Sequence, residues 1–256
     1  MPDAKRSFFM ELEDKIALVT GGARRIGAAI ARDLAAHGVG VVVHCNRSGK
    51  EAEELVGELK AKGARAWAIR GNLRELDADK FFGKLLEMTD GKLDLLVNNA
   101  SEYPASDLMT MTDDDIADMV RVHASKPLAL VQRFASLPHP DGGAVVNMLD
   151  ARITTYDKGH AAYHLSKRML FSLTRMLALE LAPDIRVNAV APGAVLQEQG
   201  QPPSELERLA QFNPLKTHGS PEGLAECVRF LLASDFITGQ ILYYDGGYHM
   251  KAATYG

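Results

Sequence analysis

The stretch VTGGARRIGAAIARDLAAHG, from Val19 to Gly38, has the pattern of a strand end, a tight turn and the start of a helix. Gly21 and Gly22 allow the turn, and Gly27 lets the helix approach the strand closely. The free N–H groups of the first helical turn face this turn and make an anion site suited to a pyrophosphate. The spacing G-x-G-x-x-G is absent, so these glycines alone are weak evidence for a dinucleotide site.

Arg25 stands in this turn, where a glycine would be the easier choice because the backbone must come close to a phosphate. One interpretation is an arginine at a helix start that is simply solvated. The other is a guanidinium that binds phosphate oxygens and an acceptor-rich substrate, which a glycine cannot do. We favour the second interpretation.

Apolar segments bounded by turn residues alternate with amphipathic segments along the chain. We predict seven short strands, at 15–20, 39–45, 64–71, 93–99, 143–149, 184–191 and 239–247. Helical patterns lie between them, at Ile26 to His37, Lys50 to Lys62, Leu76 to Met88, Asp113 to Ser136, His160 to Leu181 and Pro221 to Ala233. Such alternation predicts an α/β fold, a single-domain, doubly wound, Rossmann-like parallel sheet of about seven strands with helices on both faces.

A chain of 256 residues with 46% hydrophobic residues has the size of one α/β domain. We expect an N-terminal extension at 1–14 and a single domain at 15–256. Residues 193–220 break the alternation, with a glutamine-rich part from Gln197 to Gln201 and a short helical pattern from Ser204 to Phe212. An insert directly after a strand end is more typical of a lid or substrate loop than of a linker.

The formal net charge of −4 gives no electrostatic reason to expect nucleic acid or an anionic membrane as a partner. Only Cys45 and Cys227 are present, without metal-ligand spacing, which favours structural burial in a reducing compartment and no metal site. No apolar run approaches the roughly 20 residues that span a bilayer. We therefore expect a cytoplasmic protein that is not bound to a membrane.

The end of the second predicted strand, HCNRSGKEAEE, indicates the type of cofactor. A carboxylate there would bind a ribose 2′-hydroxyl, whereas an arginine binds a 2′-phosphate. No acid stands at the strand end, Arg47 and Ser48 are placed to bind a phosphate, and Arg24 lies within reach of the same site. This pattern favours NADPH over NADH. The alternative is an ordinary exposed loop arginine.

Tyr163 and Lys167, in YHLSK, are four residues apart in a predicted helix and hence on one face. A nearby cation favours phenolate, so we expect Lys167 to lower the pKa of Tyr163 and prepare it for proton exchange near neutral pH. A lone Tyr-x-x-x-Lys is common by chance. Its weight here comes from its place between two predicted strands of a nucleotide-binding sheet.

Several motifs in this order resemble the short-chain dehydrogenase/reductase family. They are Thr-Gly-x-x-x-Arg-x-Gly from Thr20 to Gly27, the Tyr163 and Lys167 pair, NNAS at Asn98 to Ser101, Pro192-Gly193 and ITGQILYYDGG near the end. The resemblance covers nearly the whole chain, from Lys15 to Tyr248. It implies that the domain at 15–256 binds NADPH and that residues 193–220 form its substrate loop. It also implies a homotetramer or homodimer, formed through the two long helices predicted at 113–136 and 160–181.

The same resemblance implies which side chains and backbone groups contact the cofactor. These residues are Gly21, Arg24, Arg25, Ile26, Arg47, Ser48, Asn72, Leu73, Asn99, Ala100, Ser101, Tyr163, Lys167, Pro192 and Gly193. Asn72 takes the place of an acid that often lies near the adenine, and it can still hydrogen-bond the adenine edge. His123 takes the place of an asparagine that helps to hold a proton-relay water. His123 either holds that water or is satisfied within the helix packing, and both interpretations stay open.

Asp150 is the most informative departure from the family. Members commonly carry a serine about 13 residues before the tyrosine, and Asp150 stands at that position. An ionised carboxylate beside a carbonyl that gains negative charge would raise the barrier, so a simple ketone is a poor substrate. Beside a ring nitrogen that must gain a proton, or an edge that carries N–H donors, the same carboxylate is useful. Alternatively, Asp150 is a surface or protonated residue, and Thr154 or Thr155 supplies a hydroxyl.

With Asp150, the chain resembles the pteridine reductases and the related dihydromonapterin reductases, which reduce C=N bonds of a pterin with NADPH. The resemblance implies catalytic roles for Asp150, Tyr163 and Lys167, with Tyr163 and Asp150 delivering the proton. It places the pterin against Arg25, Ser101, Tyr103, Asp150 and Tyr163. Tyr103 either stacks on the pterin or is a packed loop tyrosine. Two other functions stay open: a short-chain carbonyl reductase of the 3-oxoacyl type, and a non-catalytic NADP-binding sensor.

Overall fold

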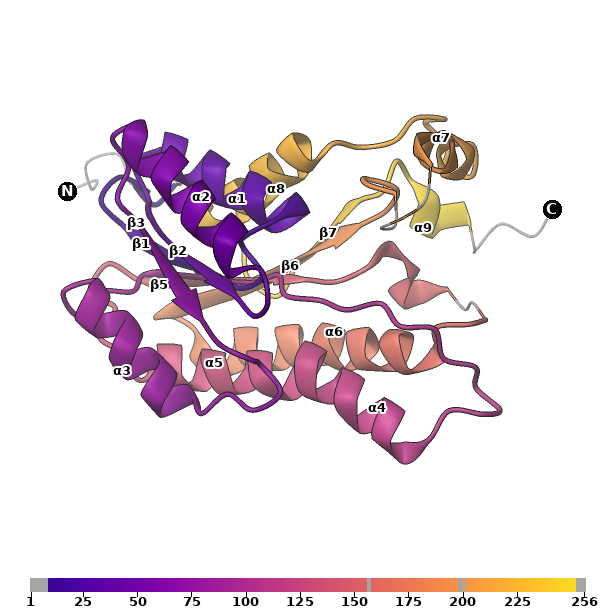
Figure 1. The fold of residues 1–256 in the computed structure, drawn as a ribbon, viewed down its shortest axis with the longest axis horizontal. Helices are drawn as coiled ribbons and strands as arrows, with labels where there is room; N and C mark the ends of the chain where they lie inside the picture. Colours follow the sequence, from indigo (N-terminus) through magenta and orange to yellow (C-terminus); the bar gives the residue numbers. More distant parts are fainter. Residues whose placement is uncertain (1–8, 156–157, 198–199, 201, 252–256) are drawn as a thin grey trace, which may run out of the picture.

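The computed structural model describes residues 9–155, 158–197, 200 and 202–251, and these form one seven-stranded parallel sheet (Figure 1). The strand order is β3-β2-β1-β4-β5-β6-β7. The strands are β1 (Ile16–Val19), β2 (Gly40–Cys45), β3 (Ala66–Arg70), β4 (Leu95–Asn98), β5 (Gly143–Met148), β6 (Ile185–Pro192) and β7 (Ile241–Tyr244). The predicted doubly wound α/β fold is confirmed, and the strand order reverses between β1 and β4, where such sheets bind ligands.

Some sequence predictions fall outside the described residues. These are the first eight residues of the N-terminal extension, residues 198, 199 and 201 of the glutamine-rich segment, and residues 252–256 of the domain.

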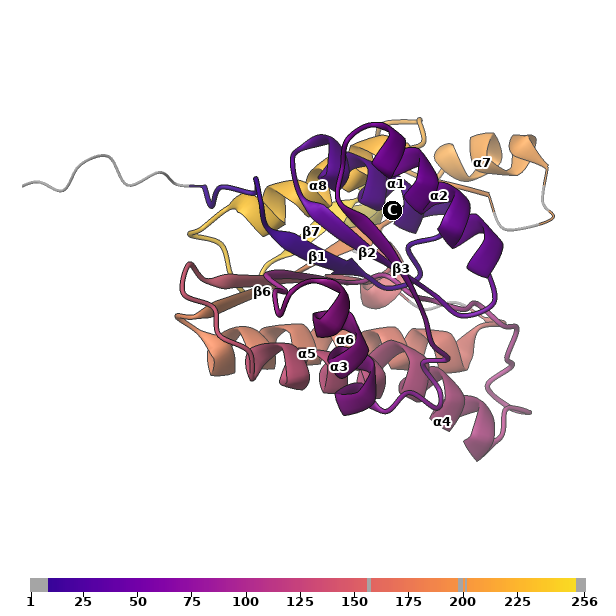
Figure 2. The ribbon, with the colours of Figure 1, turned by 60° about the vertical axis from the view of Figure 1, so that its left-hand side comes forward.

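Helices cover both faces of the sheet, as Figures 1 and 2 show from two directions. One layer consists of α1 (Arg25–Ala36), α2 (Gly49–Ala61) and α8 (Pro221–Ala233). The other consists of α3 (Ala78–Met88), α4 (Asp113–Val120), α5 (Lys126–Ala135) and α6 (Ala161–Leu181). Successive residues of β2 serve the two layers, because side chains alternate along a strand: Val41 and Val43 join one core cluster and Val42 the other.

Capping residues explain where several helices begin. Thr112 and Asp115 form a capping box at the start of α4, and Ser220 caps α8 ahead of Pro221. The third helix begins at Ala78 and not at Leu76, because the Asp77 side chain accepts a hydrogen bond from the backbone of Lys80.

The single helix predicted from Asp113 to Ser136 is wrong in one respect. A widened π turn, η1 (Arg121–Ser125), separates α4 from α5. Pro127 has no N–H to give to the carbonyl of His123, and its ring would collide with that carbonyl in a regular α-helix. The N–H of Lys126 bonds instead to the carbonyl of Arg121, five residues earlier.

Three short elements lie at the carboxyl edge of the sheet. The predicted helix from Ser204 to Phe212 is present as α7 (Pro203–Ala210). Sequence patterns do not indicate the other two, η2 (Ala151–Thr154), which follows β5, and α9 (Tyr248–Lys251), which packs near η2. Both are a single turn long, too short for helical periodicity to show.

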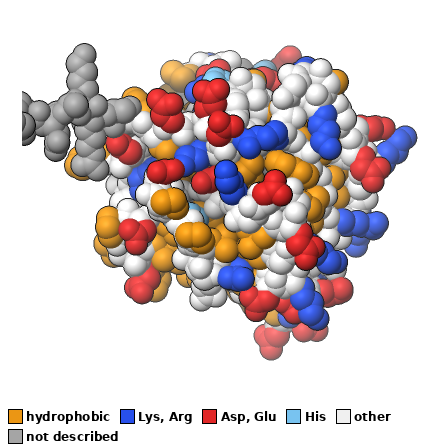
Figure 3. All heavy atoms as spheres, turned by 90° about the vertical axis from the view of Figure 1, so that its left-hand side faces the viewer, with side chains coloured by type: hydrophobic (Ala, Val, Ile, Leu, Met, Phe, Trp, Pro, Cys, Tyr) orange, Lys and Arg blue, Asp and Glu red, His pale blue; other side chains and the backbone are white. Residues whose placement is uncertain are grey.

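The opposite edge, where the strands begin, carries acidic and basic side chains together on the face seen in Figure 3. A cavity of about 960 Å³ opens there, with Glu11, Glu13, Asp94 and Lys15 in its lining. Lys15 pairs with Asp94 at 3.7 Å and with Asp141 at 3.0 Å. The residues that the sequence singles out for chemistry follow the strands, so this cavity is not their site.

Gly27 sets the distance between α1 and the turn after β1. A Cβ atom at this position would lie 2.2 Å from the carbonyl oxygen of Gly21 and 2.7 Å from Nδ2 of Asn99. Neither partner can move freely, because one is backbone and the other is hydrogen-bonded to that backbone. Gly57, in the middle of α2, has nothing within 4 Å of the same hypothetical atom.

We predict that Gly27→Ala lowers the free energy of unfolding by about 1 to 3 kcal/mol, the usual range for overpacking. Gly57→Ala is the matched control and should raise it by about 0.5 to 1 kcal/mol, because alanine is the better helix former. Urea denaturation of both variants measures the two changes. If Gly27→Ala is as stable as Gly57→Ala, the close approach of α1 is not a constraint.

Candidate active site

Asp150 and Tyr163 meet at the carboxyl edge of the sheet. Asp150 follows β5, Tyr163 lies in the first turn of α6, and the tyrosine hydroxyl donates to Oδ2 of Asp150 at 2.9 Å. The other carboxylate oxygen, Oδ1, accepts from the backbone N–H of Arg152 at 2.7 Å and so caps η2. A hydrogen bond on each oxygen therefore fixes the carboxylate, and its Oδ2 faces the phenol.

The pKa of Tyr163 corrects one expectation from the sequence. The side chain is buried, and burial raises its pKa well above 10, with further increases from the charge of Asp150 and from the hydrogen bond to it. The prediction that Lys167 would lower this pKa is wrong for this arrangement. The phenol therefore keeps its proton at neutral pH.

Lys167 is fully buried one turn further along α6. Its Nζ donates to the carbonyl oxygen of Met148 at 2.7 Å and lies 5.7 Å from the centre of the Tyr163 ring. Burial lowers the pKa of Lys167 to about 8, against an opposing effect of the Asp150 charge. The ammonium group lies under the phenol ring and makes no hydrogen bond to its oxygen that the structure records.

Tyr103 is packed between two aromatic rings. It stacks on His160 with 3.7 Å between ring centres and meets Tyr163 edge-on at 4.6 Å. Arg152 donates to its hydroxyl at 3.2 Å. Tyr103 therefore lies beside Tyr163, and in this structure one of its faces is covered by His160. Of the two threonines offered as hydroxyl sources, Thr155 bonds back to Arg152 and Thr154 is exposed.

Side chains of β1 and β4 hold the first turn in place. The hydroxyl of Thr20 accepts from the backbone N–H groups of Asn99 and Ala100 at 2.9 and 3.0 Å. The Asn99 amide donates to the carbonyls of Thr20 and Gly21 at 2.9 and 3.1 Å. Asn99 and Ala100, both predicted to contact the cofactor, thus also shape the turn.

His44 is a structural part of the site that the sequence analysis missed. Its Nδ1 lies 3.2 Å from the backbone N of Gly21, and its Nε2 lies 3.0 Å from the carbonyl oxygen of Gly71. A backbone N–H can only donate, so Nδ1 accepts and the neutral ring carries its proton on Nε2. Burial lowers the pKa of His44 to about 4. No signal in one sequence marks such a histidine, because its partners come from two other strand ends.

Arg25 adopts a left-handed backbone conformation, with φ of 52°. This region suits glycine and is strained for other residues. Its guanidinium donates to the carbonyl oxygen of Gln197 at 2.6 Å, so the turn after β1 is tied to the start of the predicted substrate loop. A glycine at this position would adopt the same backbone conformation, but it would have no side chain to reach the loop.

The other predicted cofactor residues line the same edge. Ser48 precedes α2, whose N-terminus has no side-chain cap, and Arg47 is exposed beside it. Arg24 pairs with Glu51 in the first turn of α2 at 3.5 Å, which keeps it near Arg47. The remaining predicted residues contact protein atoms. Asn72 accepts a hydrogen bond from the backbone N–H of Arg74, and Leu73 and Ile26 pack against the core. Gly193, which follows Pro192, donates its backbone N–H to the carbonyl oxygen of Tyr244.

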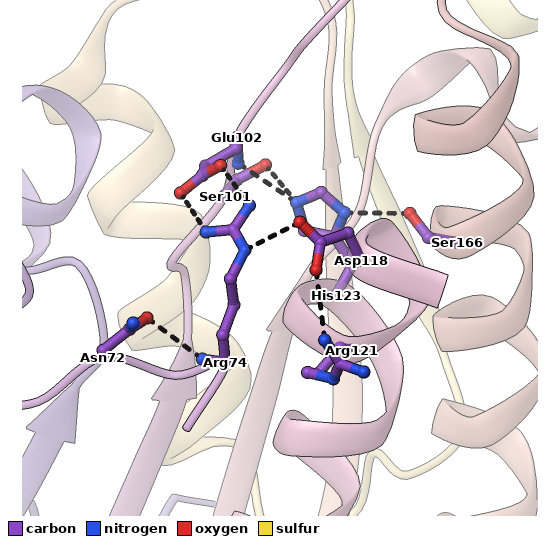
Figure 4. Close-up of polar contacts among 8 residues, drawn as sticks. All are labelled: Asn72, Arg74, Ser101, Glu102, Asp118, Arg121, His123 and Ser166. Atoms are coloured by element: carbon purple, nitrogen blue, oxygen red, sulfur yellow. Dashed lines mark hydrogen bonds and ion pairs between the residues drawn. The ribbon is translucent and has the colours of Figure 1, made fainter. Parts of the chain in front are cut away.

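His123 lies at the centre of the polar network in Figure 4 and is 1% exposed. Its Nε2 lies 3.1 Å from the backbone N of Glu102 and 3.0 Å from the hydroxyl of Ser101. Its Nδ1 lies 2.9 Å from the hydroxyl of Ser166, which donates to the carbonyl of Tyr163. Burial, then the charges of Lys167 and Arg74, lower the pKa of His123 to about 2.

Arg74 completes this network on the outer side. It makes two hydrogen bonds to the carboxylate of Glu102, at 2.9 and 2.7 Å, and a third to Asp118 of α4 at 3.0 Å (Figure 4). Asp118 also pairs with Arg121. The hydrogen bond to Arg74 lowers the pKa of Glu102. Segments that follow β3 and β4 are thereby joined to the helix layer below them.

Two kinds of feature are absent from the described part of the chain. No helix there is long and apolar enough to cross a membrane. Nor does that part contain a cluster of three or more histidine, cysteine or acidic side chains that could hold a metal ion.

Comparison with known proteins finds both sequence and structural relatives. Residues 21–249 match a family model described as enoyl-(acyl carrier protein) reductase. Among relatives in sequence is the 3-oxoacyl-[acyl-carrier-protein] reductase FabG of Staphylococcus epidermidis, which is 34% identical over 244 residues. That alignment covers 93% of this chain and 100% of the relative.

Solved structures with the same fold include a FolM alternative dihydrofolate reductase 1 from Brucella canis, complexed with NADP. It is 35% identical, has a TM-score of 0.89, and the match covers 94% of this chain and 96% of that one. The angucycline C-6 ketoreductase LanV with bound NADP is 31% identical, with a TM-score of 0.86 and coverage of 94% and 97%.

We predict a difference between two substitutions of Arg25. Both Arg25→Gly and Arg25→Ala remove the contact to Gln197, but only glycine relieves the left-handed backbone. Arg25→Gly should therefore be more stable than Arg25→Ala by about 1 kcal/mol in chemical denaturation. At Glu53, an exposed interior position of α2, the order should reverse, because alanine is the better helix former. Equal stabilities at position 25 would show that this φ is not strained in solution.

We also predict that protonation of the unfolded state at His44 destabilises the protein in mild acid. The folded pKa of about 4 lies below the ordinary 6.5, so the unfolded chain binds more protons between these values. The stabilising contribution of His44 is fully present above pH 6.5 and is lost as the pH falls towards 4. The shift corresponds to about 3 kcal/mol, at roughly 1.4 kcal/mol per pKa unit.

The control for this prediction is His44→Asn, which keeps an acceptor for Gly21 and cannot titrate. At pH 7 the variant should be less stable than the parent protein, because it loses the bond to Gly71. At pH 4 the gap should have narrowed or reversed by about 3 kcal/mol. A gap that stays constant across this range would mean that His44 is not buried in neutral form.

Proposed function

The chain belongs to the short-chain dehydrogenase/reductase family, and from this premise we propose that it reduces C=N bonds of a pterin with NADPH, as in conversion of a dihydropterin to a tetrahydropterin. One observation carries the proposal: the carboxylate of Asp150 lies 2.9 Å from the hydroxyl of Tyr163, at the position where the family commonly has a serine. The similarity to FolM alternative dihydrofolate reductases, at 35% and 36% identity, supports the same substrate class.

The residues at the first turn fit a dinucleotide. No side chain caps the N-terminus of α1, which leaves its N–H groups to face an anion. A Cβ at Gly21 would lie 2.9 Å from Cα of Ala100, so any residue other than glycine would force this turn to change its shape. Arg47, Ser48 and Arg24, near the end of β2, would bind the 2′-phosphate of NADPH. When bound, NADPH supplies the hydride.

Tyr163 supplies the proton. Its raised pKa keeps the phenol protonated at neutral pH. Without substrate the hydroxyl donates to Asp150, and the O–H bond turns from this carboxylate to the substrate for the transfer. The proton passes from Oη of Tyr163 to the ring nitrogen next to the carbon that gains hydride. Asp150 favours this step, because a carboxylate stabilises a nitrogen that becomes more positive and accepts hydrogen bonds from N–H groups of the heterocycle. Lys167 lies beneath the ring and offsets the charge left on the oxygen.

The second candidate is a short-chain carbonyl reductase of the 3-oxoacyl type. Its support is the 34% identity to the FabG of Staphylococcus epidermidis. The geometry at Asp150 disfavours it, because a ketone oxygen gains negative charge during reduction and would lie near an anion. A third candidate, a non-catalytic NADP-binding sensor, has no use for a buried phenol held for proton transfer.

Assembly and location are further expectations. A homodimer or homotetramer through the long helices fits the exposed apolar side chains of α6, where Met176 is 63% and Leu179 is 84% exposed. Such side chains in a row indicate a surface that another molecule covers. We expect the protein to act in the cytoplasm on a small pterin.

The test is NADPH oxidation with a dihydropterin and with an acetoacetyl thioester, measured side by side on the parent protein, Tyr163→Phe and Asp150→Ser. The parent should oxidise NADPH with the dihydropterin and hardly with the thioester. Tyr163→Phe should lose at least a hundredfold in kcat while binding NADPH normally, since general acid catalysis contributes about 10² to 10⁴. Asp150→Ser should lose pterin activity and gain on the thioester.

Turnover of the thioester alone by the parent protein would replace the pterin proposal with the carbonyl-reductase one. Normal NADPH binding without turnover of either substrate would favour the sensor. An unchanged substrate profile in Asp150→Ser would show that the carboxylate does not select the substrate.

A further inference from the structure

His123 joins the two segments that face each other across the reacting atoms. On one side are Ser101 and Glu102, which lead to Tyr103. On the other is Ser166, one turn beyond Tyr163 on α6 (Figure 4). We propose that His123 is a positioning residue, whose ring holds the Ser101–Tyr103 segment at a fixed distance from Tyr163 through protein hydrogen bonds and not through a proton-relay water. This inference rests on Tyr163 as the proton donor, and it applies to either substrate class.

The protonation of the ring follows from its partners. The backbone N–H of Glu102 can only donate, so Nε2 of His123 is an acceptor. Nδ1 then carries the proton and donates to the Ser166 hydroxyl, whose own proton is given to the carbonyl of Tyr163 at 2.6 Å. Every hydrogen bond in this series has a defined direction. Both ring nitrogens are engaged by protein atoms, so the ring has no lone pair or N–H turned towards a water.

Glu102 is held from two sides. Its backbone N–H bonds to His123, and its carboxylate is held by two hydrogen bonds from Arg74, which is anchored to Asp118. Ser101 and Tyr103 flank this doubly held residue. The ring of His123 also meets the ring of Tyr163 edge-on, with 5.3 Å between centres. The position of Tyr103 against Tyr163 is therefore set through Glu102 and His123.

The π turn explains how the ring can serve both sides. His123 is the middle residue of η1, where the wider turn adds a residue relative to an α-helix and re-aims the side chains. An asparagine, as the family commonly has, would place its amide at the distance of Nδ1 and stop short of the Nε2 partners. Only a longer side chain spans from Ser166 to the backbone of Glu102.

Two substitutions test the hydrogen bonds of the two ring nitrogens separately. His123→Asn keeps a polar atom near Nδ1 and its bond to Ser166, but loses Glu102 and Ser101. His123→Gln places an oxygen near Nε2, which can accept from Glu102, but loses the bond to Ser166. We expect His123→Asn to raise KM for the substrate at least tenfold with kcat within threefold. We expect His123→Gln to keep KM within threefold and to lower kcat by about tenfold.

The pH profile gives an independent comparison. A positioning residue should change KM or the height of the kcat profile and leave the apparent pKa values of that profile in place, whereas a relay group should move these pKa values. The matched control is His139→Asn, since His139 is a part-buried histidine held by the Phe134 carbonyl before β5, at the opposite edge. His139→Asn should leave both KM and kcat within threefold. Thermal unfolding and NADPH affinity are recorded for every variant, so a folding defect is recognised as such.

Hydrogen exchange at the Glu102 amide, followed by NMR without substrate, tests the tie directly. His123→Asn should speed this exchange at least tenfold, and His123→Gln should leave it within threefold of the parent. Equal exchange in His123→Asn and the parent, equal kinetic effects of the two substitutions, or a moved pH profile would each overturn the proposal.

The outcome is separable from that of the proposed function. If the parent reduces the thioester and not the dihydropterin, the pterin assignment fails, and the same variants are measured on the thioester. If neither substrate is reduced, the exchange rate of the Glu102 amide still decides whether His123 holds this segment.

Discussion

The hydrogen bond between Asp150 and Tyr163 is the interaction on which the site depends. Its two members come from different layers, since Asp150 follows β5 of the central sheet and Tyr163 lies in the first turn of α6, which packs on one face of it. Their separation is thus set by the packing of α6 against the sheet, where Leu170 joins Ala189 and Ala191 of β6 in one core cluster. A carboxylate with hydrogen bonds on both oxygens can remain in this partly buried place, because its desolvation is compensated.

Burial shifts three ionisable groups of the site, Tyr163, Lys167 and His123, towards their neutral forms. The pKa of the Tyr163 phenol rises, that of the Lys167 ammonium falls to about 8, and that of the His123 ring falls to about 2. Tyr163 and His123 are consequently neutral near pH 7, and each holds its proton in a defined hydrogen bond. In the proposed mechanism, the carboxylate of Asp150 decides which change of charge the site favours.

The sequence predicts the sheet well, because its signals are local. Apolar runs of strand length, capping residues such as Thr112, and the spacing of Tyr163 and Lys167 need no knowledge of distant contacts. The partners of His44 and His123 could not be predicted, since each ring joins segments that lie far apart in the chain. The sign of the Tyr163 pKa shift was wrong for a related reason: helical spacing shows that Lys167 is near, but not that Asp150 is nearer and that both lie in a buried site.

Arg25 shows how one residue can meet two demands that compete in the same turn. The backbone after β1 requires a left-handed residue, which glycine would adopt without strain, and an arginine there carries a strain of about 1 to 2 kcal/mol. Its guanidinium reaches Gln197 at the start of the segment after β6, a contact that joins the turn to the predicted substrate loop. A strained residue persists where the surrounding structure fixes it and a function needs it. The strain at Arg25 therefore supports the proposal that this turn contacts the substrate as well as a phosphate.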